Sequence, residues 1–169
     1  MDSKLFPTNE PVNDEIIDLD LSVTKKKKFR FNKDDSRILE LNTSDLNLLS
    51  RVSETYPKLQ ALQDKASKLM DGIEVDETNE ELTMASATTM AERLRNIDNE
   101  MRGYLDYMFN ANVSEITAPD GSMYDPFQGS FRYEYIINLL ITQYETNLRT
   151  EFGKMEKQLK KHTEKYTRR

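Results

Sequence analysis

The chain has 169 residues, of which 24 are Lys or Arg and 30 are Asp or Glu, giving a formal net charge of -6. It has no Cys and one His, which excludes a disulfide scaffold, a Cys-based zinc or iron–sulfur centre, a thiol nucleophile and a multi-histidine metal site. The hydrophobic fraction of 37% is low for a globular domain. We therefore expect a lean core whose stability a partner completes.

The two ends of the chain carry opposite charge. Residues 1–20 contain one Lys against six acidic residues, a net charge of −5, and residues 151–169 contain seven basic against three acidic residues, a net charge of +4. Residues 1–15 also contain Pro7 and Pro11 and have no periodic apolar face, which predicts an acidic, disordered N-terminus. Solubility explains the charge asymmetry, and steering of a partner or ordered self-association is the alternative.

Residues 16–42 are predicted to form a small antiparallel β meander. Apolar residues alternate with polar ones over 17–23, and the alternation resumes at Phe29-Arg30-Phe31 after the lysines at 25–28. Residues 32–36 form a turn cluster, and residues 38–41 form another short strand. Two or three short strands are marginal alone, so a helix should cover their apolar face.

Thr43-Ser44-Asp45 predicts a helix start, because a Ser or Thr side chain accepts a hydrogen bond from a backbone N–H in the first turn. Apolar residues then recur at steps of three and four and give one stripe, which consists of Leu46, Leu49, Val52, Tyr56, Leu59, Leu62, Ala66 and Leu69. Pro57 should kink or restart this helix, and Gly72 should end it in a left-handed conformation.

Residues 73–79 are an acidic linker, and a long helix should begin near Glu80. Its apolar residues follow steps of four and three, which is a heptad seam made adaptable by methionine. Gly103 weakens this helix locally by about 1 kcal/mol. The predicted seam consists of Met90, Leu94, Ile97, Met101, Tyr104 and Met108.

Residues 110–130 form the longest break, in which Val113 to Thr117 is compatible with a short strand and residues 118–122 are a strong turn signal. The last helix runs from about Phe131 to near the end of the chain. Its first half is nearly apolar all round and predicts core, whereas its second half is basic and should protrude or dock a partner. The partner-binding residues predicted on it are Leu148, Phe152, Met155 and Leu159.

The expected fold is mainly α with a small N-terminal antiparallel β meander, an α+β arrangement with long amphipathic helices. We divide the chain into a disordered acidic N-terminus at 1–15, a single helical domain at 16–150 that includes the β segment at 16–42, and a basic C-terminal helix extension at 151–169.

The sequence offers little for catalysis. The acidic pairs Asp34-Asp35 and Glu80-Glu81 fall in a turn and at a helix start, where solvent and the helix dipole explain them. A calcium loop beginning at Asp120 fails because its twelfth residue is Phe131 and not Glu. His162 lies among lysines without ligand partners. We expect no enzyme, no cofactor and no metal.

The lysines at 25–28 with the aromatic residues after them, and the basic C-terminal end, also suggest nucleic-acid binding. The overall acidity of the chain argues against nucleic acid as a partner. A charged strand edge that prevents aggregation explains the lysines equally well.

The segment KFRFNKDDSRILELNTSDLNLLSRVSETYPKLQ resembles the front of small tail assembly chaperones of tailed bacteriophages, and the later MRGYLDYMFN is also similar. The likeness covers residues 25–70 and 95–145, while the loop at 110–130 is longer here and the basic C-terminal helix is extended. The resemblance implies a non-enzymatic virion-assembly protein that keeps the tape-measure protein soluble and recruits tail-tube subunits.

Three functions follow as hypotheses. The first is the phage tail assembly chaperone, with tape-measure and tail-tube proteins as partners. The second is a structural virion or coiled-coil interaction protein, which includes a homo-oligomer, and the third is a nucleic-acid-binding accessory protein. No apolar run approaches the roughly 20 residues that span a bilayer, so we expect no membrane and a cytoplasmic location, in the host cell if the chain is viral.

Overall fold

The computed structural model describes residues 26–72 and 84–167. Within these ranges the chain is mainly helical with two small antiparallel hairpins, which confirms the predicted fold class. The elements in chain order are β1 Lys27–Arg30, β2 Ile38–Leu41, α1 Asn47–Asp71, α2 Met84–Phe109, α3 Val113–Thr117, β3 Pro126–Phe127, β4 Ser130–Phe131 and α4 Arg132–Thr167.

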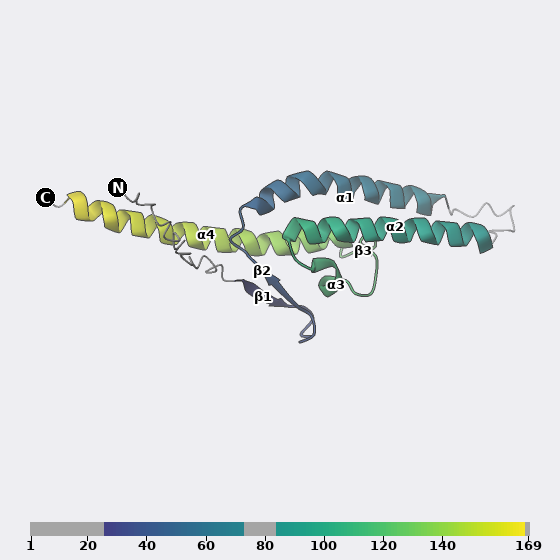
Figure 1. The fold of residues 1–169 in the computed structure, drawn as a ribbon, viewed down its shortest axis with the longest axis horizontal. Coiled ribbons are helices and arrows are strands. Elements are labelled where there is room, and N and C mark those ends of the chain that lie inside the picture. The colour runs from purple at the N-terminus through teal and green to yellow at the C-terminus, as the bar shows by residue number, and fades with distance from the viewer. Residues whose placement is uncertain (1–25, 73–83, 168–169) are drawn as a thin grey trace, which may run out of the picture.

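The body is built around α2. Helices α1 and α2 run side by side in opposite directions, and the first half of α4 runs along α2, while β1, β2 and α3 lie on the other side of α2 from α1 (Figure 1). One core joins these elements. Its fully buried side chains include Leu39, Leu59, Met101, Leu105 and Leu140. The small hydrophobic core therefore takes side chains from the first hairpin and from all three long helices.

The predicted alternation holds in the first hairpin. Along β2, Leu39 and Leu41 are buried while Ile38 and Glu40 are exposed, because successive side chains of a strand point to opposite faces. The turn that joins β1 to β2 is held by Asp34, whose Oδ1 accepts hydrogen bonds from both the amide and the hydroxyl of Ser36. The turn predicted at 32–36 is therefore confirmed. The strand predicted over 17–23 lies outside the described residues.

Helix α1 differs from its predicted start and end. The capping bond comes from Asp45, whose Oδ1 accepts the Asn47 amide at 2.9 Å, and not from Thr43 or Ser44. The helix continues through Pro57 without a restart and arches along its length (Figure 1). Gly72 ends it in a right-handed conformation, with φ −71°, so the predicted left-handed cap is wrong.

The buried stripe of α1 is also out of phase with the prediction at its start. Leu48 is buried, whereas Leu46 is 58% exposed and Leu49 is 67% exposed. Further along, the stripe follows the predicted positions, with Leu59 and Leu62 in the core. The first turn of the helix therefore presents two leucines to solvent.

Residues 113–117 form the helix α3 and not the short strand considered for them. The reason is a cap supplied from another element: Asp106 on α2 accepts the Ser114 amide at 2.7 Å and the Ser114 hydroxyl at 2.9 Å. A carboxylate placed at the first turn satisfies backbone donors that a helix start leaves open.

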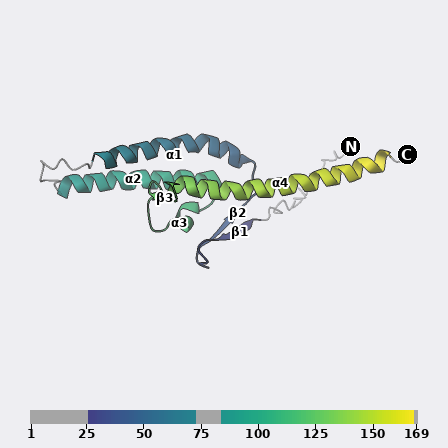
Figure 2. The ribbon, with the colours of Figure 1, turned by 180° about the vertical axis from the view of Figure 1, so that it is seen from behind.

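Helix α4 has two parts. Its 36 residues, about 54 Å at 1.5 Å per residue, begin inside the body, where Tyr133, Ile137, Leu140 and Tyr144 are buried. Its second half projects beyond the other described elements, as both views show (Figures 1 and 2). None of the described helices is long and apolar enough to cross a bilayer.

Two leucines on α1 test this account of the core. Leu59→Ala should lower the free energy of unfolding by about 2–5 kcal/mol, because it removes a fully buried side chain and leaves a cavity. Leu49→Ala, the matched control on the same helix, should change it by less than about 0.5 kcal/mol, since that side chain is exposed. Urea denaturation measures both, and equal losses would contradict the placement of these residues.

Candidate protein-binding surfaces

The seam predicted on α2 is largely used inside the molecule. Ile97, Met101 and Met108 are buried, and Leu94 and Tyr104 are partly buried against the core. Met90, nearer the start of α2, is half-buried. Met101 and Met108 therefore belong to the core of the molecule, and in this conformation they are not available to another protein.

The stripe predicted on α4 emerges from the body. Leu148 is half-buried, and Phe152, one turn later, is 53% exposed. The side chains of Met155 and Leu159 lie outside the described part of the structure. Residues at steps of three and four share one face of a helix, so the backbone places all four on the same side of α4.

Asn147 marks the point where α4 leaves the body. This side chain is 8% exposed, and its Nδ2 donates hydrogen bonds to the Thr43 carbonyl and to the Ser44 hydroxyl, both at 3.2 Å. The segment just before α1 is thereby fastened to the middle of α4. Beyond Asn147, among the described side chains of α4, none is classed as buried.

The apolar stripe of α4 continues past the same point. Ile137, Ile141, Tyr144 and Leu148 follow steps of 4, 3 and 4, and a second step of four then leads to Phe152. From Phe152 the regular alternation of three and four continues to Tyr166. Steps of three and four bracket the 3.6 residues of a helical turn, so the extra step of four keeps Phe152 on the same face as Leu148. The stripe inside the body therefore continues into the projecting half of α4, where Phe152 is exposed.

The exposed leucines of α1 lie at this same end of the body. Leu46 and Leu49 follow Thr43 and Ser44, which Asn147 fastens to α4. Sequence periodicity assigned both leucines to the core, so their exposure was missed. With Phe152 they give the junction of α1 and α4 three large exposed apolar side chains.

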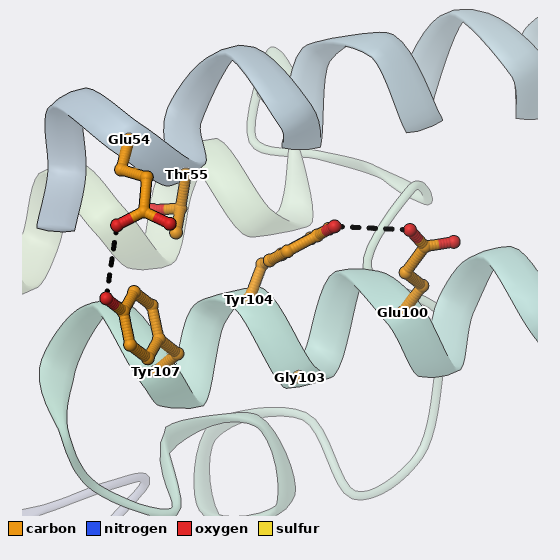
Figure 3. Close-up of a pocket in the computed structure, with 6 residues that line it drawn as sticks. All are labelled: Glu54, Thr55, Glu100, Gly103, Tyr104 and Tyr107. Atoms are coloured by element: carbon orange, nitrogen blue, oxygen red, sulfur yellow. Dashed lines mark hydrogen bonds between the residues drawn. The ribbon is translucent and has the colours of Figure 1, made fainter.

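A groove of about 440 Å³ lies between α1 and α2 (Figure 3). Its polar groups satisfy one another: the Tyr107 hydroxyl donates to Glu54 at 3.1 Å and the Tyr104 hydroxyl donates to Glu100 at 3.3 Å. The pKa of Glu54 lies below its ordinary value because Lys58 and then Tyr107 donate hydrogen bonds to its carboxylate. A carboxylate held ionised in this way is unsuited to act as a general acid at neutral pH.

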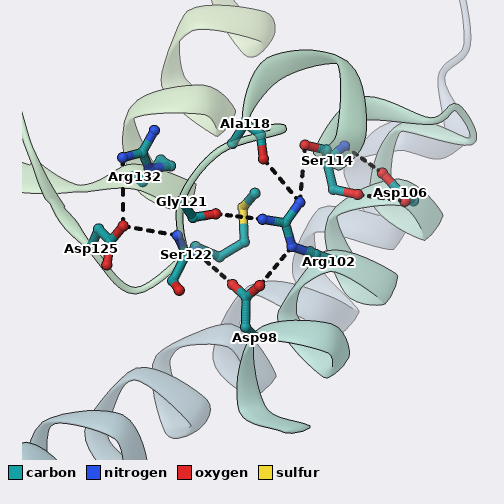
Figure 4. A network of polar contacts seen from close by, with 10 residues as sticks. Asp98, Arg102, Asp106, Ser114, Ala118, Gly121, Ser122, Asp125 and Arg132 are labelled. Carbon is teal, nitrogen blue, oxygen red and sulfur yellow. Dashed lines mark hydrogen bonds and ion pairs between the residues drawn. The ribbon is translucent and has the colours of Figure 1, made fainter. Parts of the chain in front are cut away.

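Arg102 on α2 holds the long loop that precedes α4 (Figure 4). Its Nε donates to Asp98 Oδ2 at 2.7 Å, one helical turn away. Its two other nitrogens donate to the backbone carbonyls of Ser114, Ala118 and Gly121. The planar guanidinium thus binds one carbonyl of α3 and two of the irregular segment after it, which a lysine ammonium does less well.

Asp98 completes the same clamp and connects it to α4. Its second oxygen accepts the Met123 amide at 2.6 Å. The Met123 carbonyl accepts the Tyr133 amide at 3.0 Å, and the Asp125 carbonyl accepts the Arg132 amide at 2.9 Å. The first turn of α4 is therefore set by the loop that Arg102 and Asp98 hold. The turn predicted at 118–122 is confirmed, and the clamp that positions it was not foreseen.

The other residues considered for catalysis or metal binding do not form a cluster within the described ranges. No group of three or more His, Cys, Asp or Glu residues is placed to hold a metal ion there. Asp34 is engaged with Ser36 in the hairpin turn. Glu80, Glu81 and the side chain of His162 lie outside the description.

Comparison with known proteins adds no relative: no family model, no curated protein and no solved structure matches this chain.

Arg102→Lys tests the clamp. It should lower the free energy of unfolding by about 1.5–3 kcal/mol, the usual range for lost hydrogen bonds to a charged group. It should also speed hydrogen exchange of the Met123 amide, because the loop that presents this amide to Asp98 loosens. Arg95→Lys, at an exposed position on the same helix, is the control and should leave both values unchanged. Unchanged exchange at Met123 in Arg102→Lys would contradict the clamp.

Two glycines make a second matched pair. Gly103→Ala should raise the free energy of unfolding by about 0.8–1 kcal/mol, because a Cβ there meets open space and alanine favours the helix. Gly121→Ala should lower it, because the residue has φ +135° and a Cβ would approach the Arg132 guanidinium to 2.9 Å. Thermal and urea unfolding of the two variants measure the opposite signs.

Proposed function

We propose that this chain is a non-enzymatic assembly protein that binds another polypeptide through the projecting half of α4 and the adjacent first turn of α1. The observation that carries the proposal is the seam of α4 beyond Asn147, where Phe152 is 53% exposed while the seam of α2 is taken up by the core. The binding surface is thereby assigned to α4 and α1 and not to the methionine seam of α2.

The energetics of an isolated helix support this assignment. Residues 148–167 extend about 30 Å past the last anchored residue. A helix gains most of its stability in proteins from packing of its apolar face, and a segment of this length is marginal in water by itself. An external protein that covers the seam would supply that packing, as helix-in-groove recognition does in other systems.

The more specific form of the proposal is a tail assembly chaperone. It rests on the resemblance of residues 25–70 and 95–145, and its partners are the tape-measure protein and the tail-tube protein. A chaperone for long apolar helices needs an apolar surface that is exposed before the client arrives. Leu46, Leu49 and Phe152 give the chain such a surface.

A structural or coiled-coil interaction protein is the second candidate, favoured by one observation. From Phe152 the positions 155, 159, 162 and 166 follow in steps of three and four, which is the repeat of a coiled-coil seam, with His162 as its polar member. This candidate differs from the first in its partner, which would be a second copy or a permanent virion component and not a transient client.

Co-expression tests the chaperone. The chain should increase the soluble fraction of a co-expressed tape-measure protein of a tailed bacteriophage, and Phe152→Ser should weaken the complex about tenfold or more. This estimate assumes that burial of a Phe side chain contributes about 1.5–3 kcal/mol and that 1.4 kcal/mol is tenfold. Leu139→Ser is the matched control, because Leu139 is 41% exposed on the same helix but within the body.

The outcomes separate the candidates. No gain in solubility with the unmodified chain would reject the chaperone function. A gain that Phe152→Ser and Leu139→Ser reduce equally would reject the projecting seam as its site. Sedimentation at several concentrations tests the second candidate, since a strict monomer without a partner removes the self-associating form.

A further inference from the structure

The groove between α1 and α2 has an open floor at a glycine. It is lined by Glu54, Thr55, Glu100, Gly103, Tyr104 and Tyr107 (Figure 3). A Cβ built on Gly103 would meet nothing within 4 Å, so the packing of α2 does not require a glycine here. Glycine also destabilises a helix interior relative to alanine. The residue therefore costs stability and leaves space in the groove for a ligand.

One carboxylate of the groove lacks a basic partner. Glu100 lies one helical turn before Gly103, and its Oε1 accepts the Tyr104 hydroxyl at 3.3 Å. Within the described residues, its Oε2 accepts no hydrogen bond and no basic side chain pairs with it. Across the groove, Glu54 is paired with Lys58 at 3.2 Å. Two carboxylates against one ammonium leave a net negative charge, which favours a cationic ligand.

Lys58 shows within the chain how this surface holds a cation. Its Nζ lies 5.3 Å from the centroid of the Tyr104 ring while it pairs with Glu54. An ammonium over an aromatic face is attracted by the ring quadrupole. The other side of the groove offers the same kinds of group, the carboxylate of Glu100 and the ring of Tyr107, which is 50% exposed. In the described structure no cation lies over the Tyr107 ring.

The spacing along α2 fits a long cationic side chain. Glu100, Gly103 and Tyr107 follow steps of three and four and so share one face of the helix. Gly103 and Glu100 are about 4.5 Å apart along the helix axis, at 1.5 Å per residue, a separation suited to the four-carbon stem of lysine. Lysine and arginine bury such stems along apolar surface while the charged end stays at the water boundary. A stem over Gly103 would thus bring the charge to Glu100.

The openness of the groove favours a polypeptide over a free small cation. Glu100, Gly103 and Tyr107 are all exposed. Small-molecule sites bury roughly 70–90% of the ligand surface, whereas a free amine on this groove would stay largely in solvent. A side chain carried by a polypeptide does not need such enclosure, because its backbone is held by further contacts along the rims of the two helices.

We propose that the groove between α1 and α2 binds a lysine or arginine side chain of a second polypeptide, with its aliphatic stem over Gly103 and its charged group at Glu100. None of the residues that line the groove belongs to the projecting half of α4 or to the first turn of α1. The site is therefore separate from the surface of the proposed function and stands or fails independently of it. Gly103 exchanges helix stability for binding.

Two pairs of variants test the site. Gly103→Ala should make the chain more stable and yet weaken binding several-fold, because the added methyl takes the space of the stem. Gly153→Ala is the matched control, since a Cβ there also meets nothing within 4 Å but the residue lies on α4, outside the groove. Glu100→Gln should weaken binding by up to about fivefold, as loss of an exposed ion pair does. Glu92→Gln, at an exposed position on α2 outside the groove, should leave binding unchanged.

Binding is measured by NMR titration of the full chain, followed at the Gly103 amide and at the Tyr104 and Tyr107 rings. The probes are a capped, alanine-rich helical peptide with one central arginine, the same peptide with citrulline, which is nearly isosteric but uncharged, and N-acetylargininamide as a free cation. We expect the arginine peptide to bind most tightly.

Equal affinity of the arginine and citrulline peptides, or no shift with either, overturns the proposal. So does a Gly103→Ala variant that gains stability without losing affinity. N-acetylargininamide binding as tightly as the arginine peptide would assign the groove to a small cation and overturn the polypeptide occupant. None of these titrations contains a tape-measure protein, so their failure leaves the solubility test of the proposed function standing.

Discussion

The direction of α4 depends on one guanidinium. Arg102 binds the Ser114 carbonyl of α3 and two carbonyls of the loop that follows α3, and Asp98 holds both Arg102 and the Met123 amide. Backbone bonds from Met123 and Asp125 then fix the first turn of α4. The position of the projecting half is therefore set at two points, by these contacts at the first turn of α4 and by the hydrogen bonds of Asn147 at its middle.

The second constraint is the boundary at Asn147. Before it, the apolar residues of α4 face the core; after it, the same face continues beyond the body and Phe152 meets solvent. Heptad repeats on α2 and α4 look alike in the sequence, but α2 is enclosed by α1 and α4 over most of its seam. What separates a core seam from an available one is therefore the location of the neighbouring elements, which periodicity does not encode.

Local pattern predicted the three long helices and the hairpin at 27–41 because their apolar spacing is long or regular enough to set secondary structure by itself. Local pattern failed where a contact outside that pattern determines the conformation of a segment. Val113 to Thr117 becomes a helix because Asp106 caps it, and the first turn of α1 rotates outward because Asp45 both caps it and pairs with Arg51 at 2.6 Å.

The α2 seam was assigned to a partner because nothing local distinguishes a partner's helix from the chain's own. The exposure of Phe152 on α4 was predictable from the sequence. The second half of this helix has one apolar stripe and is otherwise polar and basic, so it was expected to project from the core.

The exposed end of the body combines two opposing tendencies. The exposed apolar side chains of Leu46, Leu49 and Phe152 favour association. The net charge of +4 over the last 19 residues opposes association between identical copies. A partner that covers the exposed leucines at the start of α1 together with Phe152 removes more apolar surface from water than one that covers Phe152 alone, so the geometry favours a partner that contacts both elements.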